Sequence, residues 1–346
     1  MFFFIKEKGE KIMQGRLEHA KKRQKAIKCL IKDTPKYVQE YCYSLMATKE
    51  PTTTEGYVRE ILNFLKYINE DIKTIDITNV TRTDIDKYLI FRSVKIKNGE
   101  EVRNSFAYQK RIVAVIKNFF EYLLDTDIIR KNPAENLSPK TGKDDVKRYH
   151  LTSEDLQQIL RAVDRGTGNE IARKKQEHWN TRDKAILALF INTGMRLSAL
   201  TEINIDEVDL KNHQLTIIDK RSKIHHYELT ESLERILKNW LNDRNIKLEE
   251  KPCDALFISN RRERIHPFSV RSLVEKYVEE GIGIKLSPHK IRAGVCTLLY
   301  ETTGDIKFVA DFIGHANVAT TQRYIVNNGR AKKTGAELIN KAVFNS

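Results

Sequence analysis

Two arginines, two histidines and a tyrosine have the chemistry needed to bind and cleave a phosphodiester. His289 and Arg292 stand three positions apart, and Tyr324 comes nine positions after His315. Arg196 lies far upstream of these four. The forked guanidinium of arginine can hold two phosphate oxygens at once, a geometry that lysine does not reproduce. A phenol beside such a group can attack the phosphorus and form a covalent intermediate.

The flanking residues predict the helices that carry these side chains. Ser287-Pro288 is typical of a helix start, with a hydroxyl at the N-cap and proline at the first helical position. His289 and Arg292 then share one face of the first turn, where outward-pointing N–H groups favour a phosphate. Arg196 opens another helix, after a Thr-Gly pair that ends the preceding apolar one.

A second helix boundary is expected just before His315. Gly304-Asp305 separates two helices, and the second runs to Gly314, so His315 directly follows a helix C-terminus. The negative end of the helix dipole favours the protonated form of a histidine at this position. A further short helix is expected to present Tyr324.

In this order and at these spacings, the set resembles the active site of the tyrosine recombinase or phage integrase family of Xer- and Cre-like site-specific recombinases. The resemblance covers about residues 35–330 and is sharpest in the C-terminal domain. It implies that a lysine in a β-hairpin protonates the leaving 5′-oxygen. By its position after Arg196 that lysine is Lys220, and Lys223 in the same turn is the alternative.

The resemblance also implies the reaction. Tyr324 attacks the phosphorus to give a 3′-phosphotyrosyl link and a free 5′-hydroxyl, while the arginines stabilise charge and the histidines supply hydrogen bonds and proton transfer. A 5′-hydroxyl from a second strand reverses the step, so DNA strands are exchanged through a Holliday junction, in integration, excision or resolution. Two alternatives stay open, a type IB topoisomerase and a catalytically inactive sequence-specific DNA-binding protein. The small helical domain and the complete residue set favour the recombinase.

The implied partner is double-stranded DNA with paired inverted-repeat sites, around which two domains close as a C-shaped clamp. A homotetramer on synapsed DNA follows from the same resemblance, which leaves room for accessory DNA-bending proteins. Two positions depart from the family pattern. Ala199 stands where an acidic residue is usual, and Ala293 where histidine is frequent. Glu202 is a candidate to replace the missing carboxylate.

Composition agrees with a nucleic-acid partner. The 346 residues include 61 Lys and Arg against 47 Asp and Glu, a formal net charge of +14 that favours a polyanion. The four cysteines are widely separated, which indicates free thiols in a reducing cytoplasm. No run is long and apolar enough for a membrane span. No Walker-type loop or acidic cluster appears, and His225 and His226 would lie on opposite faces of a strand, so we expect neither cofactor nor metal.

Apolar residues recur mainly at helical spacing, so the chain is predicted to be mainly α with a small antiparallel sheet. Two β-prone runs, 215–218 and 224–229, flank a polar turn and predict a hairpin in the second domain. The tail is expected to form a short amphipathic helix that packs on a neighbouring subunit or on its own domain. The expected segments are a basic arm or helix (1–34), a helical core-binding (SAM-like) DNA-binding domain (35–137), a linker (138–150), a catalytic domain (151–330) and the tail (331–346).

Overall fold

The computed structural model describes residues 21, 23–97, 99–142, 149–218, 224–249, 251–315 and 317–322. The chain divides into two compact units, Met1–Val146 and Lys147–Ser346. Helices dominate both units and each contains one small antiparallel sheet, which confirms the predicted mainly α fold. Most of the basic arm, the hairpin turn 219–223 and the tail 331–346 lie outside the described residues.

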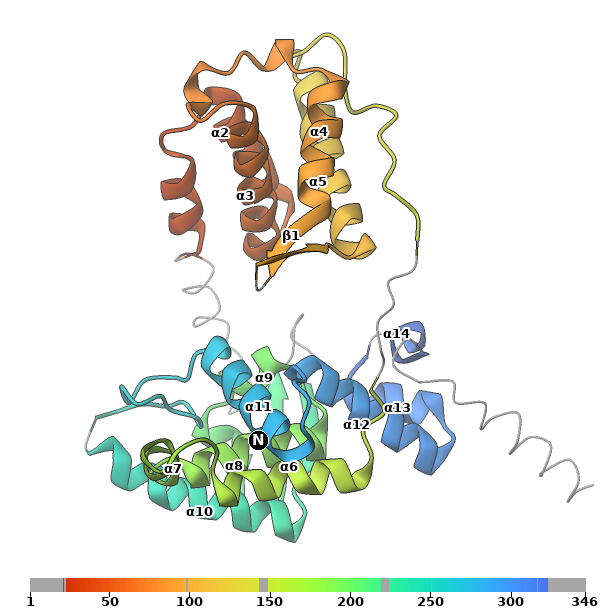
Figure 1. Ribbon diagram of the computed structural model, residues 1–346. Helices are drawn as coiled ribbons and strands as arrows, with labels where there is room; N and C mark the ends of the chain where they lie inside the picture. The colour runs from red at the N-terminus through yellow and green to blue at the C-terminus, as the bar shows by residue number, and fades with distance from the viewer. Residues whose placement is uncertain are drawn as a thin grey trace, which may run out of the picture. The chain divides into compact units, whose positions relative to one another are not determined.

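Among the described residues, four longer helices make up most of the first unit and lie side by side in Figure 1. Residues 23–31 add a further helical segment, whose Ile27 and Ile31 are buried in the same core. Their inward faces carry the apolar residues that recur at helical spacing in the sequence, such as Ile61 and Phe119, both fully buried. Thr81 begins α4 with a capping box to Asp84. The elements are α2 (Lys36–Thr48), α3 (Pro51–Ile68), η1 (Ile72–Thr74), η2 (Ile77–Asn79), α4 (Arg82–Ser93) and α5 (Phe106–Asp125).

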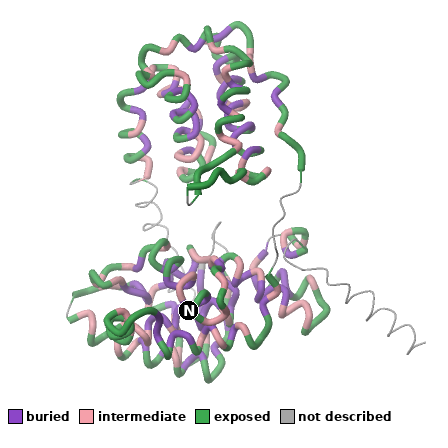
Figure 2. Tube along the Cα trace, in the orientation of Figure 1, coloured by how far each residue is buried: buried purple, intermediate pink, exposed green. Residues whose placement is uncertain are grey.

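A two-stranded hairpin links α4 to α5, which the sequence did not predict. Strands β1 (Val94–Lys97) and β2 (Glu100–Arg103) pair antiparallel, and every residue of both strands is exposed, as Figure 2 shows. The sequence does carry a signal for it, because Val94 and Ile96 alternate with lysines and Asn98-Gly99 follows, a pair typical of a tight hairpin turn.

A buried carboxylate joins three helices of the first unit. Glu60 of α3 is only 3% exposed. Tyr88 of α4 donates a 2.6 Å hydrogen bond to one oxygen, and Arg92 donates a 3.0 Å bond to the other. Arg111 of α5 lies 3.6 Å from the same second oxygen. Burial, then the hydrogen bond to Glu60, raise the pKa of Tyr88. We call these four residues the Glu60 cluster.

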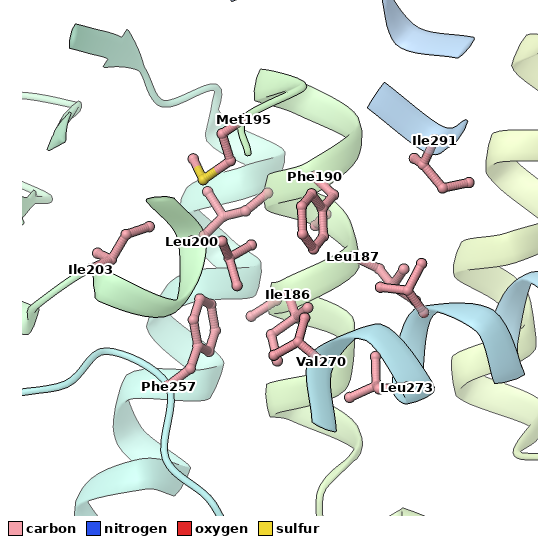
Figure 3. Close-up of a cluster of buried hydrophobic side chains, with 14 of the residues drawn as sticks. Ile186, Leu187, Phe190, Met195, Leu200, Ile203, Phe257, Val270, Leu273 and Ile291 are labelled. Carbon is pink, nitrogen blue, oxygen red and sulfur yellow. The ribbon is translucent and has the colours of Figure 1, made fainter. Parts of the chain in front are cut away.

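The second unit is built around α8, whose residues are buried along most of its length. Helices α6, α10, α11 and α12 all contact it. Figure 3 shows Ile186 and Phe190 of α8 gathered with Leu200 and Val270 in this core. The helices of this unit are α6 (Ser153–Arg165), α7 (Glu170–Glu177), α8 (Asn180–Thr193), α9 (Leu197–Glu202), η3 (Ile205–Glu207), α10 (Glu231–Leu248), α11 (Pro267–Ile282), α12 (Pro288–Thr303), α13 (Ile306–Ile313) and α14 (Val318–Gln322).

The predicted hairpin of the second unit is present as part of a three-stranded antiparallel sheet. Its order is β3 (Val208–Asp209), β4 (Gln214–Ile218) and β5 (Ile224–Glu228). Leu215 pairs with Tyr227, and Ile218 pairs with Ile224 at the end next to the turn. Side chains alternate along β5, so residues 225 and 227 share one face and residue 226 lies on the other.

Within the part of the chain that the structure describes, no helix is long and apolar enough to cross a membrane. The cytoplasmic location stays a prediction.

Candidate active site

Helix α12 begins as the sequence predicts, with Ser287 at the N-cap and Pro288 at the first helical position. His289 and Arg292 follow on its first turn but differ in environment. His289 is exposed, whereas Arg292 is only 3% exposed. The structure therefore places one of the pair at the surface and the other beneath it.

Arg292 forms hydrogen bonds to two turns that are far apart in the sequence. Its Nη1 donates to the carbonyl oxygen of Gly194, and its Nη2 donates a 3.0 Å bond to the carbonyl oxygen of Ile313. These carbonyls lie at the C-terminal ends of α8 and α13. A guanidinium held by two backbone groups has little rotamer freedom left to lose when it binds a substrate.

Gly194 brings Arg196 next to this guanidinium. Gly194 ends α8 with φ of 56°, a left-handed conformation that favours glycine. A Cβ at this position would stand 2.4 Å from Ile313 Cδ1 and 3.3 Å from Val295 Cγ1. Only a glycine allows this approach, and Arg196 then follows as the half-buried N-cap of α9.

An open groove of about 430 Å³ connects the two arginines with His289. It also receives Arg271 of α11, which sequence reasoning missed; Arg271 forms a 2.8 Å pair with Glu275 one turn away. The polar residues that line the groove are Arg196, Ser198, Arg271, Ser287, His289 and Arg292.

His315 directly follows Gly314, the left-handed C-cap of α13, as predicted. It is 9% exposed, and its Nδ1 is 2.8 Å from the hydroxyl oxygen of Thr321. Thr321 is fully buried and was not singled out in the sequence, where it is one of two adjacent threonines with no distinguishing pattern. The structure therefore adds Thr321 as a partner that orients the imidazole.

The surroundings of His315 oppose the protonated form that the helix dipole favours. Burial, and then the nearby charges of Arg292 and Arg196, lower the pKa of His315 from 6.5 to about 4. The helix dipole contributes at most about 2 kcal/mol in the opposite direction, which burial beside two guanidiniums outweighs. The pKa of His289 is also lowered, by partial withdrawal from water and by Arg292. Both histidines are therefore neutral at pH 7.

Arg196, His289, Arg292 and His315 form one site, which we call the arginine–histidine cluster. The charges of Arg292 and Arg196 both act on His315, and His289 lines the same groove as the two arginines. Lys220, Lys223 and Tyr324 lie outside the described residues, so their roles remain predictions. The chain reaches them directly from described elements: Lys220 is two residues beyond β4, and Tyr324 is two residues beyond α14.

The two departures from the family pattern are also located. Ala199 is buried in α9, and Ala293 is half-buried in α12. Glu202, the candidate replacement for an acid at position 199, is exposed at the end of α9. Within the described ranges, no three His, Cys, Asp or Glu side chains gather as a metal site.

Comparison with known proteins identifies this architecture. Residues 149–330 match the phage integrase family. The chain is 30% identical over 312 residues to tyrosine recombinase XerC of Caldanaerobacter subterraneus subsp. tengcongensis, which covers 84% of this chain and 82% of that protein. It is 33% identical over 217 residues to tyrosine recombinase XerC of Alcanivorax borkumensis, covering 62% and 67% respectively.

Solved structures with the same fold include two recombinases on DNA. XerH site-specific recombinase bound to a palindromic difH substrate aligns with a TM-score of 0.62 at 19% identity, covering 89% of this chain and 83% of that one. A lambda integrase dimer bound to a COC′ core site aligns with a TM-score of 0.60 at 18% identity, covering 85% and 95%. At these identities the likeness shows the fold.

Proposed function

Since the chain belongs to the phage integrase family and is a tyrosine-type site-specific DNA recombinase, we propose that its arginine–histidine cluster binds the scissile phosphate that Tyr324 attacks. The observation that carries this assignment is the convergence of Arg196, His289 and Arg292 on one open groove. The relatives named above are recombinases, which disfavours the topoisomerase and the inactive DNA-binding protein.

In the first chemical step, the phenolic oxygen of Tyr324 forms a bond to phosphorus, and the bond from phosphorus to the 5′-oxygen breaks. The product is a 3′-phosphotyrosyl link. The leaving oxygen takes a proton from Lys220, or from Lys223 if the alternative holds, and becomes a 5′-hydroxyl. A 5′-hydroxyl of the other DNA duplex then attacks the phosphotyrosine and releases Tyr324. The phosphodiester energy is conserved, so exchange through a Holliday junction needs no ATP.

The groove holds its charge-stabilising groups in place before the reaction begins. Arg292 is fixed by two backbone carbonyls, so its guanidinium need not reorganise as negative charge develops on the phosphate oxygens. A preorganised donor of this kind contributes about 10²–10³-fold to the rate. His289 lies on the groove with a lowered pKa, so its neutral ring can accept the proton that Tyr324 loses.

The DNA-bound assembly is also part of the proposal. The partner is double-stranded DNA with inverted-repeat sites, on which four copies of the chain synapse, with accessory DNA-bending proteins where the site requires them. A structural neighbour described as a lambda integrase tetramer bound to a Holliday junction, with a TM-score of 0.61 at 17% identity, supports this stoichiometry by fold analogy. Residues 35–137 and the catalytic domain 151–330 would both bind DNA, and the tail 331–346 would contact a neighbouring subunit. The reaction takes place in the cytoplasm.

The test is Tyr324→Phe on a nicked suicide substrate, which traps the covalent adduct. The variant loses only the nucleophilic oxygen, so adduct formation should be abolished while DNA affinity changes less than about twofold. Tyr300→Phe is the matched control, because Tyr300 is a half-buried tyrosine of α12, and it should form the adduct normally. A covalent adduct on the Tyr324 variant would remove that residue from the role of nucleophile.

A further inference from the structure

Strand β5 lies directly against the turn that carries His315. A side chain at Gly314 would place its Cβ 2.6 Å from His225 Cε1 and 3.0 Å from His225 Nε2. The imidazole of His225 therefore covers the backbone of Gly314 at contact distance. Gly314 also has φ of 75°, so both its conformation and its neighbour require a residue without a Cβ.

A second contact repeats this arrangement two residues along. The ring of Tyr227 meets the ring of Phe312 edge-on, with centroids 6.0 Å apart and planes at 83°. His225 and Tyr227 are themselves stacked at 6.5 Å. Alternate residues of β5 thus contact alternate residues at the end of α13. Two contacts along one strand fix its position along the helix end better than one contact does.

The same strand forms one arm of the hairpin whose turn holds Lys220 and Lys223 in the sequence. Ile218 pairs with Ile224, and His225 is the next residue of β5. A slip of β5 by one residue would turn His225 and Tyr227 away from α13, because side chains alternate across a strand. Contact with Gly314 and Phe312 therefore selects one register of the hairpin relative to the His315 turn.

We propose that His225 is a positioning residue for protonation of the leaving 5′-oxygen. Its ring, packed on Gly314, sets the hairpin that carries the general acid against the turn that carries His315. The inference rests on the proposed function of the hairpin lysine as general acid. In this role His225 acts through its contacts with Gly314 and Tyr227.

The decisive experiment compares two substrates at saturating DNA. One has an ordinary 5′-oxygen leaving group, and the other has a 5′-bridging phosphorothiolate, whose sulfur leaves without protonation. His225→Ala should cleave the ordinary substrate at least about tenfold more slowly than the unmodified protein and the phosphorothiolate at nearly the same rate. DNA affinity and the thermal unfolding midpoint, measured on the same samples, separate this effect from loss of folding.

Two further variants of the same strand sharpen the test. His226→Ala is the matched control, because His226 lies on the opposite face with its Nδ1 3.0 Å from the Thr216 hydroxyl; both substrates should react normally. His225→Phe restores a flat ring against Gly314 and should recover most of the lost rate. Equal slowing on both substrates by His225→Ala, or no recovery with phenylalanine, would overturn the proposal.

Lysine variants in the same assay separate the general-acid role of the hairpin lysine from the positioning role of His225. Lys220→Ala or Lys223→Ala should show the same selective rescue by phosphorothiolate. If neither lysine variant is rescued, the general-acid assignment fails and the role of His225 fails with it. If a lysine variant is rescued and His225→Ala is not, the general acid stands and only the positioning role of His225 is overturned.

Discussion

The Glu60 cluster and the arginine–histidine cluster both bury charge, but they treat it in opposite ways. The negative charge of Glu60 is compensated by two arginines and a tyrosine hydroxyl. In the arginine–histidine cluster, like charges act on one another, and the pKa of His315 falls to about 4 because of burial and the two arginines. Compensated charge joins helices, whereas concentrated positive charge makes a site for an anion.

The comparison predicts that loss of an arginine has a different consequence in each cluster. Arg292→Ala should lower single-turnover cleavage at saturating DNA by about 10²–10³, the usual effect of losing a preorganised donor to a developing oxyanion. Arg92→Ala removes a partly buried arginine of the Glu60 cluster and should leave cleavage by the folded protein unchanged. Comparable losses of cleavage in both variants would show that the two clusters do not differ in function.

The reverse experiment targets stability. Glu60→Gln should lower the free energy of unfolding by about 3 kcal/mol, the lower end for a broken buried pair, because Arg111 is half exposed and keeps access to water. Denaturant unfolding of the full chain measures this change. Asp86→Asn is the control, since its ion pair with Arg82 is exposed and worth at most about 1 kcal/mol. Equal effects of the two substitutions would contradict a special role for Glu60.

The lowered pKa of His315 predicts a pH dependence of stability. Between pH 6.5 and about 4 the unfolded chain binds a proton at this histidine and the folded chain does not. This proton binding favours the unfolded chain. The folded protein is therefore most stable above pH 6.5, and the contribution of His315 to its stability is lost as the pH falls from 6.5 to about 4. The urea midpoint of the unmodified protein should therefore fall more steeply over this range than that of His315→Gln. Parallel curves would mean that His315 titrates alike in both states.

The smallest predicted effect concerns the group that orients His315. Thr321→Val keeps the shape of the side chain but removes the hydroxyl that lies 2.8 Å from Nδ1. Cleavage should slow by about tenfold, which corresponds to about 1.4 kcal/mol in the barrier, with DNA affinity unchanged. Thr320→Val changes the neighbouring half-buried threonine and serves as the control. Wild-type cleavage by the Thr321 variant would show that His315 needs no such partner.

Local sequence patterns determined the helices and the candidate residues. The Ser-Pro start of α12, the glycines at 194, 304 and 314, and the helical spacing of apolar residues each predict an observed element, because capping and amphipathicity depend on nearby residues. The hairpin β4–β5 was predicted from two β-prone runs on either side of a polar turn. The exposed hairpin β1–β2 was missed, although Val94 and Ile96 alternate with lysines and Asn98-Gly99 follows them.

Only the tertiary structure decided the environment of each residue. The position of His315 after a helix predicted a proton, yet burial beside Arg292 and Arg196 removes it, and those arginines are far away in the sequence. Arg271, Thr321 and His225 reach the site or its supporting turn from three different elements. Sequence spacing identifies the groups that can do chemistry within one element. Desolvation and contacts between elements depend on which segments the fold brings together, and these set the protonation and orientation of those groups.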